Sequence, residues 1–296
     1  MKPLRFLPVL AALAFAASVR AENSLPDSIK LGGFAIGPQA YTFNRFTAFE
    51  AIEKAEQAGA KCIEFFPKQK LSKDRPNALL VHTMSDEDFQ ALQAKLKQHG
   101  IKAVNYGVVQ GKDEAEWRQI FEFAKKLGLY GITTEDVPHV DIIEKLVKEY
   151  DIHAGYHEHG KRMKTMKDGS VAVDPSYQVW DPNFIAKLME GRDPRIGACA
   201  DTGHWVTSGL VPVECLKILK GRIISVHLKD RPKMGIRTDD VVYGTGISDV
   251  PGILAELRAQ NFQGNMSIEY EAKWEDNVGD VKANIEYVKA WGEKHK

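Results

Sequence analysis

The chain has 296 residues, of which 40 are basic and 40 are acidic, and hydrophobic residues make up 44% of it. The even charge balance excludes a protein that binds nucleic acid through a strongly basic surface. Length and hydrophobic content together exclude a disordered chain and fit one barrel-sized domain with a large core.

The first 21 residues are typical of a cleavable secretory signal of bacterial type. Lys2 and Arg5 precede an apolar run over residues 7–17, which is too short to span a bilayer, and a small-residue pattern ends at Ala21. Removing this segment takes away three basic and no acidic residues, so the net charge becomes about −3. We therefore expect a periplasmic or secreted protein whose mature domain covers residues 22–296 and has no membrane span. An uncleaved anchor is the alternative.

Strand-like and helical segments alternate along the rest of the chain. Segments such as 46–59, 86–100 and 113–128 place apolar residues at helical spacing, and each ends at a glycine where a left-handed cap is expected. Eight alternations predict a single-domain (β/α)8 TIM barrel rather than an open doubly wound sheet. The predicted strands are 30–36, 61–66, 103–109, 131–136, 152–159, 196–201, 223–230 and 266–271.

Two stretches lack helical periodicity and are predicted to be long loops. Residues 160–181 follow the fifth strand and residues 231–248 follow the seventh. Loops of this length at a barrel mouth often cover a substrate.

The three cysteines are predicted to be buried free thiols. Cys62 and Cys199 lie in apolar strand-like segments, and Cys215 lies in a helical one. No CxxC spacing occurs in the sequence, so a thiolate zinc site is not supported.

Alternation along the strands places ionisable side chains on one face. In 223–230, Val226 and Leu228 share the apolar face, whereas His227 and Lys229 share the other. Parallel strands flanked by helices are covered on both faces, so the polar face is expected to line the barrel mouth. The same split pairs Cys199 with Asp201, His157 with His159, Thr133 with Glu135, and Glu269 with Glu271.

Four of these inward residues form a candidate metal site. His157, Asp201, His227 and Glu269 come from four successive predicted strands, and their nitrogen and oxygen donors suit Mn²⁺, Co²⁺, Zn²⁺ or Mg²⁺. Buried without compensation, such groups would carry a large desolvation cost. The alternative is a purely polar network.

Neighbouring residues leave further roles open. His159 and Glu271 lie two residues from expected ligands, so each is an alternative ligand or a substrate-binding residue. His204 could reach a substrate hydroxyl or the metal, or form part of a helix-capping turn. Glu135 is a ligand, a base or a loop carboxylate. Lys229 could stabilise an enolate oxygen or form an ion pair with Glu269 or Asp201.

Three tryptophans are expected in loops that follow strands. Trp180, Trp205 and Trp274 could pack on the apolar face of a sugar ring or serve as hydrophobic lids. Trp205 is the one assigned to substrate binding.

Four segments of the chain carry a family resemblance. They are GYHEHG at 155–160, RIGACADTGH at 195–204, SVHLKD at 225–230 and MSIEYE at 266–271. In this order they resemble the xylose isomerase-like TIM-barrel superfamily, specifically its sugar phosphate isomerase/epimerase group. The resemblance implies one divalent metal ion held by residues of strands five to eight, which fall at or near His157 and at Asp201, His227 and Glu269.

The fifth strand departs from the ketose epimerases of that group. The resemblance implies two opposed glutamates for proton removal and return, but His157 stands where one acid is expected. Simple two-glutamate 3-epimerization is therefore put in doubt, and Glu135 or Glu158 is the candidate for the missing base. Apurinic endonucleases share the barrel, but their three-zinc ligand set and cationic DNA face are not evident here.

Together these features predict an exported, metal-dependent carbohydrate isomerase or epimerase. Catalysis by Glu135, Glu269, His204 and Lys229 would transfer a proton next to a carbonyl of a small non-phosphorylated sugar. A lyase or hydratase acting on a keto-sugar or keto-glycoside is the alternative, and a non-catalytic carbohydrate-binding barrel is the second. Related barrels often assemble as dimers or tetramers, but no exposed apolar stripe argues for a homo-oligomer here.

Overall fold

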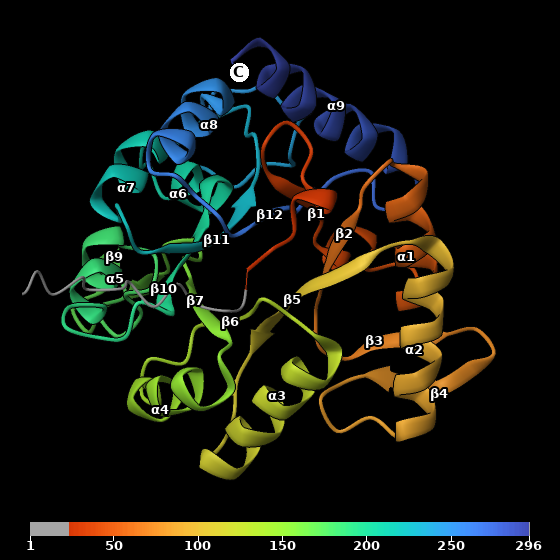
Figure 1. Ribbon diagram of the computed structural model, residues 1–296. Helices are drawn as coiled ribbons and strands as arrows, with labels where there is room; N and C mark the ends of the chain where they lie inside the picture. Colours follow the sequence, from red (N-terminus) through yellow and green to blue (C-terminus); the bar gives the residue numbers. More distant parts are fainter. Residues whose placement is uncertain (1–23, 296) are drawn as a thin grey trace, which may run out of the picture.

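The structure, a computed structural model, describes residues 24–295 and shows a parallel barrel (Figure 1). Its strands pair in the order β1, β12, β11, β10, β7, β6, β5, β2. A parallel bridge between Gln39 and Glu64 joins the first and last strands of this order. The predicted (β/α)8 barrel is confirmed. The strands are β1 (Ala35–Pro38), β2 (Cys62–Phe65), β5 (Lys102–Val109), β6 (Gly131–Thr134), β7 (His153–His157), β10 (Ile196–Asp201), β11 (Ile223–Leu228) and β12 (Asn265–Ile268).

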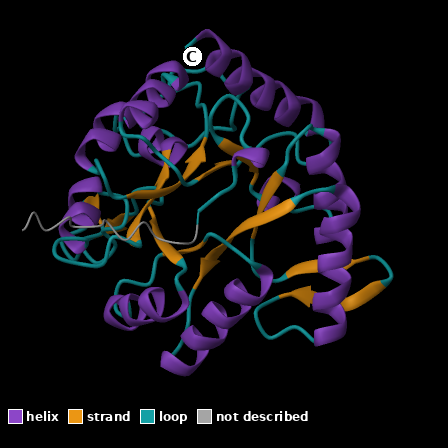
Figure 2. Cartoon of the chain, viewed as in Figure 1, coloured by secondary structure: helices purple, strands orange, loops and turns teal. Residues whose placement is uncertain are grey.

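Helices surround the barrel as an outer layer (Figure 2). Short 3-10 helices, η1 (Asp27–Ile29) and η2 (Ala40–Phe43), flank β1. The α-helices are α1 (Ala48–Gln57), α2 (Asp86–His99), α3 (Glu114–Leu127), α4 (Val140–Tyr150), α5 (Pro182–Leu188), α6 (Thr202–Thr207), α7 (Pro212–Ile218), α8 (Val250–Ala259) and α9 (Val278–Lys294).

Local sequence signals set the helix ends. The Thr47 hydroxyl accepts a hydrogen bond from the Glu50 amide, and the Glu50 carboxylate accepts one from the Thr47 amide, which forms a capping box at the start of α1. Gly100 and Gly128 end α2 and α3 in the left-handed conformation, with φ of 62° and 70°. The predicted glycine caps are therefore confirmed.

The strands are buried on both faces, as the alternation predicts. Val226 and Leu228 belong to the hydrophobic cluster between strands and helices, whereas Glu64 and His227 are fully buried polar residues. Strands β1 and β2 approach so closely that a Cβ at Gly37 would lie 2.0 Å from the Cys62 carbonyl oxygen. Only glycine fits at this position. The buried Glu64 and His227 show that the inside of the barrel holds packed polar side chains.

Two local predictions need correction, and one hairpin was missed. The first strand begins at Ala35 rather than at residue 30, because Leu31 and Phe34 form an antiparallel bridge around two glycines with positive φ. A hairpin of β3 (Gln69–Ser72) and β4 (Arg75–Leu80) was not predicted. The predicted loop 160–181 contains a second hairpin, β8 (Met163–Thr165) and β9 (Val171–Val173), whose β8 residues are exposed and carry no apolar alternation.

The predicted signal segment, residues 1–21, lies outside the described residues. Within residues 24–295, none of the helices combines the length and the apolar character needed to cross a membrane. Cys62, Cys199 and Cys215 are buried and free, as predicted.

Candidate active site and metal centre

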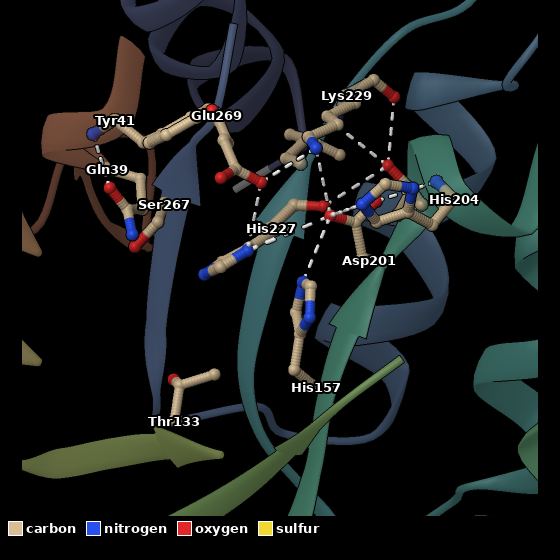
Figure 3. A network of polar contacts seen from close by, with 12 residues as sticks. Gln39, Tyr41, Thr133, His157, Asp201, His204, His227, Lys229, Ser267 and Glu269 are labelled. Carbon is tan, nitrogen blue, oxygen red and sulfur yellow. Dashed lines mark hydrogen bonds and ion pairs between the residues drawn. The ribbon is translucent and has the colours of Figure 1, made fainter. Parts of the chain in front are cut away.

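Four side chains from successive barrel strands converge at one point. His157 and Asp201 end β7 and β10, His227 lies in β11, and Glu269 follows β12 directly. One ligand atom from each lies within 4.8 Å of the other three. The close view shows the four side chains directed toward one another from their strands (Figure 3). We call this set the metal group.

The metal group has the properties of a divalent-ion site. Nε2 of His157 lies 3.5 Å from Oδ2 of Asp201, and Nδ1 of His227 lies 3.2 Å from Oε2 of Glu269. Within residues 24–295 none of these four buried atoms makes a regular hydrogen bond, although the Lys229 ammonium forms ion pairs with the two carboxylate oxygens. Buried polar atoms are normally partnered, and a nitrogen and oxygen donor set of this kind suits ions such as Zn²⁺ or Mn²⁺. The residues therefore fit a divalent metal.

A carboxylate supports the first histidine of the metal group. Oε1 of Glu135 lies 3.0 Å from Nδ1 of His157, and its Oε2 accepts a hydrogen bond from the Tyr177 hydroxyl at 2.9 Å. Burial opposes ionisation of Glu135, but the hydrogen bond from His157 lowers its pKa, so it is a carboxylate near pH 7. Such a partner fixes the ring orientation of a ligating histidine.

Lys229 lies behind the metal group. Its ammonium is 2.7 Å from Oε2 of Glu269 and 3.1 Å from Oδ2 of Asp201 (Figure 3). It also lies 3.2 Å from Oε1 of Glu271. Burial opposes its charge, but these carboxylates outweigh that effect and raise the pKa of Lys229 well above its ordinary value. Its side chain is fully buried and does not line the cavity. The predicted ion pair with Asp201 and Glu269 is present, and the predicted contact with an enolate oxygen stays a prediction.

A cavity of about 590 Å³ opens onto the metal group. Its size is in the range of pockets that bind small molecules, roughly 300–1,000 Å³. His157 and Glu269 form part of its lining, and the predicted residues Glu135, His159, His204 and Glu271 also line it. His159 and Glu271 are thus placed beside the metal group but outside it.

Two imidazoles face each other inside this cavity. The rings of His159 and His204 lie 4.1 Å apart, and Nε2 of His204 is 3.8 Å from Oδ2 of Asp201. Burial lowers the pKa of both groups, and that of His204 falls well below its ordinary value, so both rings are neutral near pH 7. The predicted capping turn is also present, because the His204 amide donates to Oδ1 of Asp201 at 2.7 Å.

Two candidate residues point away from the cavity. Trp205 is fully buried within α6 and packs in the hydrophobic core, so its assignment to substrate binding is wrong. The chain enters a helix directly after Asp201, which turns the indole outward. Glu158 is also fully buried and absent from the cavity lining, because it alternates with His157 and lies on the opposite face. It cannot supply the missing base.

Several cavity and support residues were missed. Glu64 lies fully buried on β2, 3.1 Å from Nε2 of His227. Its signal in the sequence is a carboxylate inside the short apolar strand CIEF. Arg231, which follows the end of β11 and lines the cavity, was also missed. Gln39, Tyr41 and Phe66 line the cavity from segments without metal-binding side chains.

Comparisons with known proteins agree with this geometry. A family model described as xylose isomerase-like TIM barrel matches residues 52–291. An inosose dehydratase of Clostridium botulinum (strain Eklund 17B / Type B) is 29% identical over 175 residues, which cover 54% of this chain and 48% of that protein. The chain therefore spans about half the length of this curated relative.

Solved structures show the same fold. An uncharacterized protein from Parabacteroides distasonis ATCC 8503 is 32% identical, with a TM-score of 0.68, and the match covers 87% of this chain and 99% of that one. An IOLI protein solved with a bound zinc atom has a TM-score of 0.63 at 16% identity, over 88% of this chain and 99% of that one. The second likeness concerns the fold alone.

Proposed function

The chain belongs to the xylose isomerase-like TIM-barrel family, and we propose that it is a metal-dependent lyase acting on a non-phosphorylated carbohydrate. It would remove the proton next to a carbonyl and expel the oxygen substituent at the β position. The match to an inosose dehydratase supports this reaction class. Isomerization or epimerization through the same first step is the second candidate.

The metal group would supply the acidity that this chemistry needs. His157, Asp201, His227 and Glu269 would hold a divalent ion, which would polarise the carbonyl and an adjacent hydroxyl and so acidify the hydrogen on the carbon next to the carbonyl. Glu269 belongs to the metal group and also lines the cavity. Lys229 offsets the charge of the buried carboxylates, so they stay ionised and in place.

The facing imidazoles of His159 and His204 carry the proposal. A neutral imidazole accepts a proton and can return it, so one ring serves first as base and then as acid. When His204 accepts the proton from carbon, the nearby Asp201 carboxylate stabilises the imidazolium. The proton then passes to the departing oxygen as the carbon–oxygen bond breaks and a carbon–carbon double bond forms. Elimination on one face needs only this one group.

Epimerization keeps specific support from Glu135. This carboxylate lines the cavity beside His157, where the two-glutamate enzymes implied by the resemblance carry an acid. In an epimerization, Glu269 would remove a proton from one face of the sugar, and Glu135 would return a proton to the opposite face. The hydrogen bonds from His157 and Tyr177 hold its oxygens, which favours a supporting role.

We also propose that the enzyme works outside the cytoplasm, in the periplasm or beyond it. The predicted signal segment over residues 1–21 supports this location. Sugar phosphates are largely cytoplasmic, so free keto-sugars and keto-glycosides are the proposed substrates.

Proton exchange in D₂O tests the proposal. Metal-loaded protein is incubated with inososes, free ketoses and keto-glycosides, and products are followed by NMR and mass spectrometry. An unsaturated product supports the lyase. Deuterium in the sugar without such a product supports isomerization or epimerization instead. No exchange and no product with any substrate would leave only a carbohydrate-binding barrel.

Two variants separate the steps of the reaction. His204→Gln should lose elimination because no proton reaches the departing oxygen. His99→Gln is the matched control, since His99 pairs with Glu56 on the protein surface far in sequence from the barrel mouth. Equal elimination rates in the two variants would refute the role of His204.

A further inference from the structure

Glu64 occupies the centre of the polar layer inside the barrel. It lies on β2, and its side chain is fully buried. Its Oε2 accepts hydrogen bonds from the Ser267 hydroxyl at 2.5 Å and from the Asn265 amide group at 3.2 Å. Its Oε1 lies 3.1 Å from Nε2 of His227 and accepts a longer bond from Thr133 at 3.4 Å. One carboxylate therefore ties together β2, β6, β11 and β12.

Glu64 cannot touch a substrate. It is absent from the lining of the cavity. The imidazole of His227 lies between Glu64 and the other three residues of the metal group. Any influence of Glu64 on the chemistry therefore passes through His227.

The two nitrogens of His227 have separate surroundings. Nε2 lies 3.1 Å from Oε1 of the Glu64 carboxylate, which accepts hydrogen bonds and donates none. Nδ1 faces Oε2 of Glu269 at 3.2 Å and Oδ2 of Asp201 at 3.8 Å. Two other titratable groups lie nearby, the Cys199 thiol, which contacts the imidazole, and His157, whose ring lies 5.0 Å away. A hydrogen on Nε2 leaves the lone pair of Nδ1 directed at the metal group.

We propose that Glu64 is a positioning residue that holds His227 in the tautomer with hydrogen on Nε2, so that Nδ1 is ready to bind the metal ion. The arrangement repeats the pair of Glu135 and His157, in which a carboxylate lies behind one nitrogen and the metal group in front of the other. This inference rests on the metal site of the proposed function. Removing such a partner typically lowers metal affinity about 10–100-fold.

A purely structural role of Glu64 makes a different prediction. The bonds to Ser267 and Asn265 would then matter as much as the bond to His227. Ser267→Ala removes a buried hydrogen bond to the same carboxylate and leaves His227 untouched, so it is the matched control.

Metal affinity separates these roles. Zn²⁺ binding is measured by competition with a chromophoric chelator for the full-length protein and its variants. We expect Glu64→Leu to bind Zn²⁺ about 10–100-fold more weakly than wild type. Glu64→Gln still offers an oxygen to Nε2 and should recover part of that loss, whereas Ser267→Ala should stay within about threefold of wild type.

A measurement on the wild-type protein covers the case in which Glu64→Leu does not fold. In ¹⁵N-histidine-labelled, Zn²⁺-loaded protein, His227 should show a protonated Nε2 and a metal-bound Nδ1. The opposite assignment would overturn the inference, as would wild-type affinity in Glu64→Leu or an equal loss in Ser267→Ala. A wild-type protein that binds no metal would instead overturn the metal site of the proposed function.

Discussion

Replacing Lys229 with methionine tests the charge balance beneath the cavity. The ammonium lies 2.7–3.2 Å from carboxylate oxygens of Asp201, Glu269 and Glu271, and the Lys229 and Asp201 side chains are fully buried. Methionine keeps an unbranched apolar side chain but leaves three carboxylates without this cation. Removing one partner of a buried ion pair costs about 3–5 kcal/mol, so the metal-free variant should lose that much free energy of unfolding at pH 7.

The assay is urea denaturation in the presence of EDTA. Lys217→Met is the matched control, because Lys217 forms an ion pair with Glu214 at 2.8 Å in which both side chains are more than half exposed. Exposed pairs of this kind often contribute nothing measurable, so the control should keep the wild-type midpoint. Equal midpoints for the two variants would refute the electrostatic role of Lys229.

Metal binding provides the second half of this test. At equal free Mn²⁺, the ion should stabilise Lys229→Met more than wild type, because the ammonium no longer repels the cation. Each tenfold gain in affinity adds about 1.4 kcal/mol of stabilisation under saturating conditions. A smaller stabilisation of the variant would contradict the placement of Lys229 behind the metal group.

Two further predictions concern protons and packing. Burial opposes protonation of His157, but its contacts with Asp201 and Glu135 raise its pKa to about 10 in the metal-free protein. A bound ion must displace this proton, so Zn²⁺ affinity should rise about tenfold per pH unit between pH 6 and 8 for each proton released, and a flat titration would disprove this. Gly37→Ala should cost about 1–3 kcal/mol or more, because its Cβ would lie 2.0 Å from the Cys62 oxygen. Gly279→Ala, with no atom within 4 Å of its Cβ, should instead raise the melting temperature slightly, and calorimetry of both variants checks the contrast.

Much of the fold was accessible from the sequence because alternation and periodicity are local properties. Each barrel strand overlaps its predicted segment, and the ends of β7 and β10 place His157 and Asp201 where the pattern expects them. Convergence of these residues follows from the parallel order of the strands, since their carboxyl ends share one mouth.

The depth at which a residue lies inside the barrel could not be predicted from the alternation of the sequence. Alternation assigns Glu64 to the inward face, but only the stagger of the strands places it against His227 from the far side of the barrel. Lys229 follows the end of β11, where alternation no longer fixes direction, and it lies behind the carboxylates. Trp205 was misplaced for the same reason, because a helix begins immediately after Asp201.

The joint between β1 and β2 differs from the other joints of the ring. The paired neighbours in the described sheet share several residues in register, whereas these two strands meet through the single bridge of Gln39 with Glu64. The ring is therefore closed by a narrow backbone contact, and Glu64 is one of the two residues in that bridge. The same residue contacts a histidine of the metal group across the interior. The residue whose backbone closes the barrel is therefore also the one whose side chain supports its polar centre.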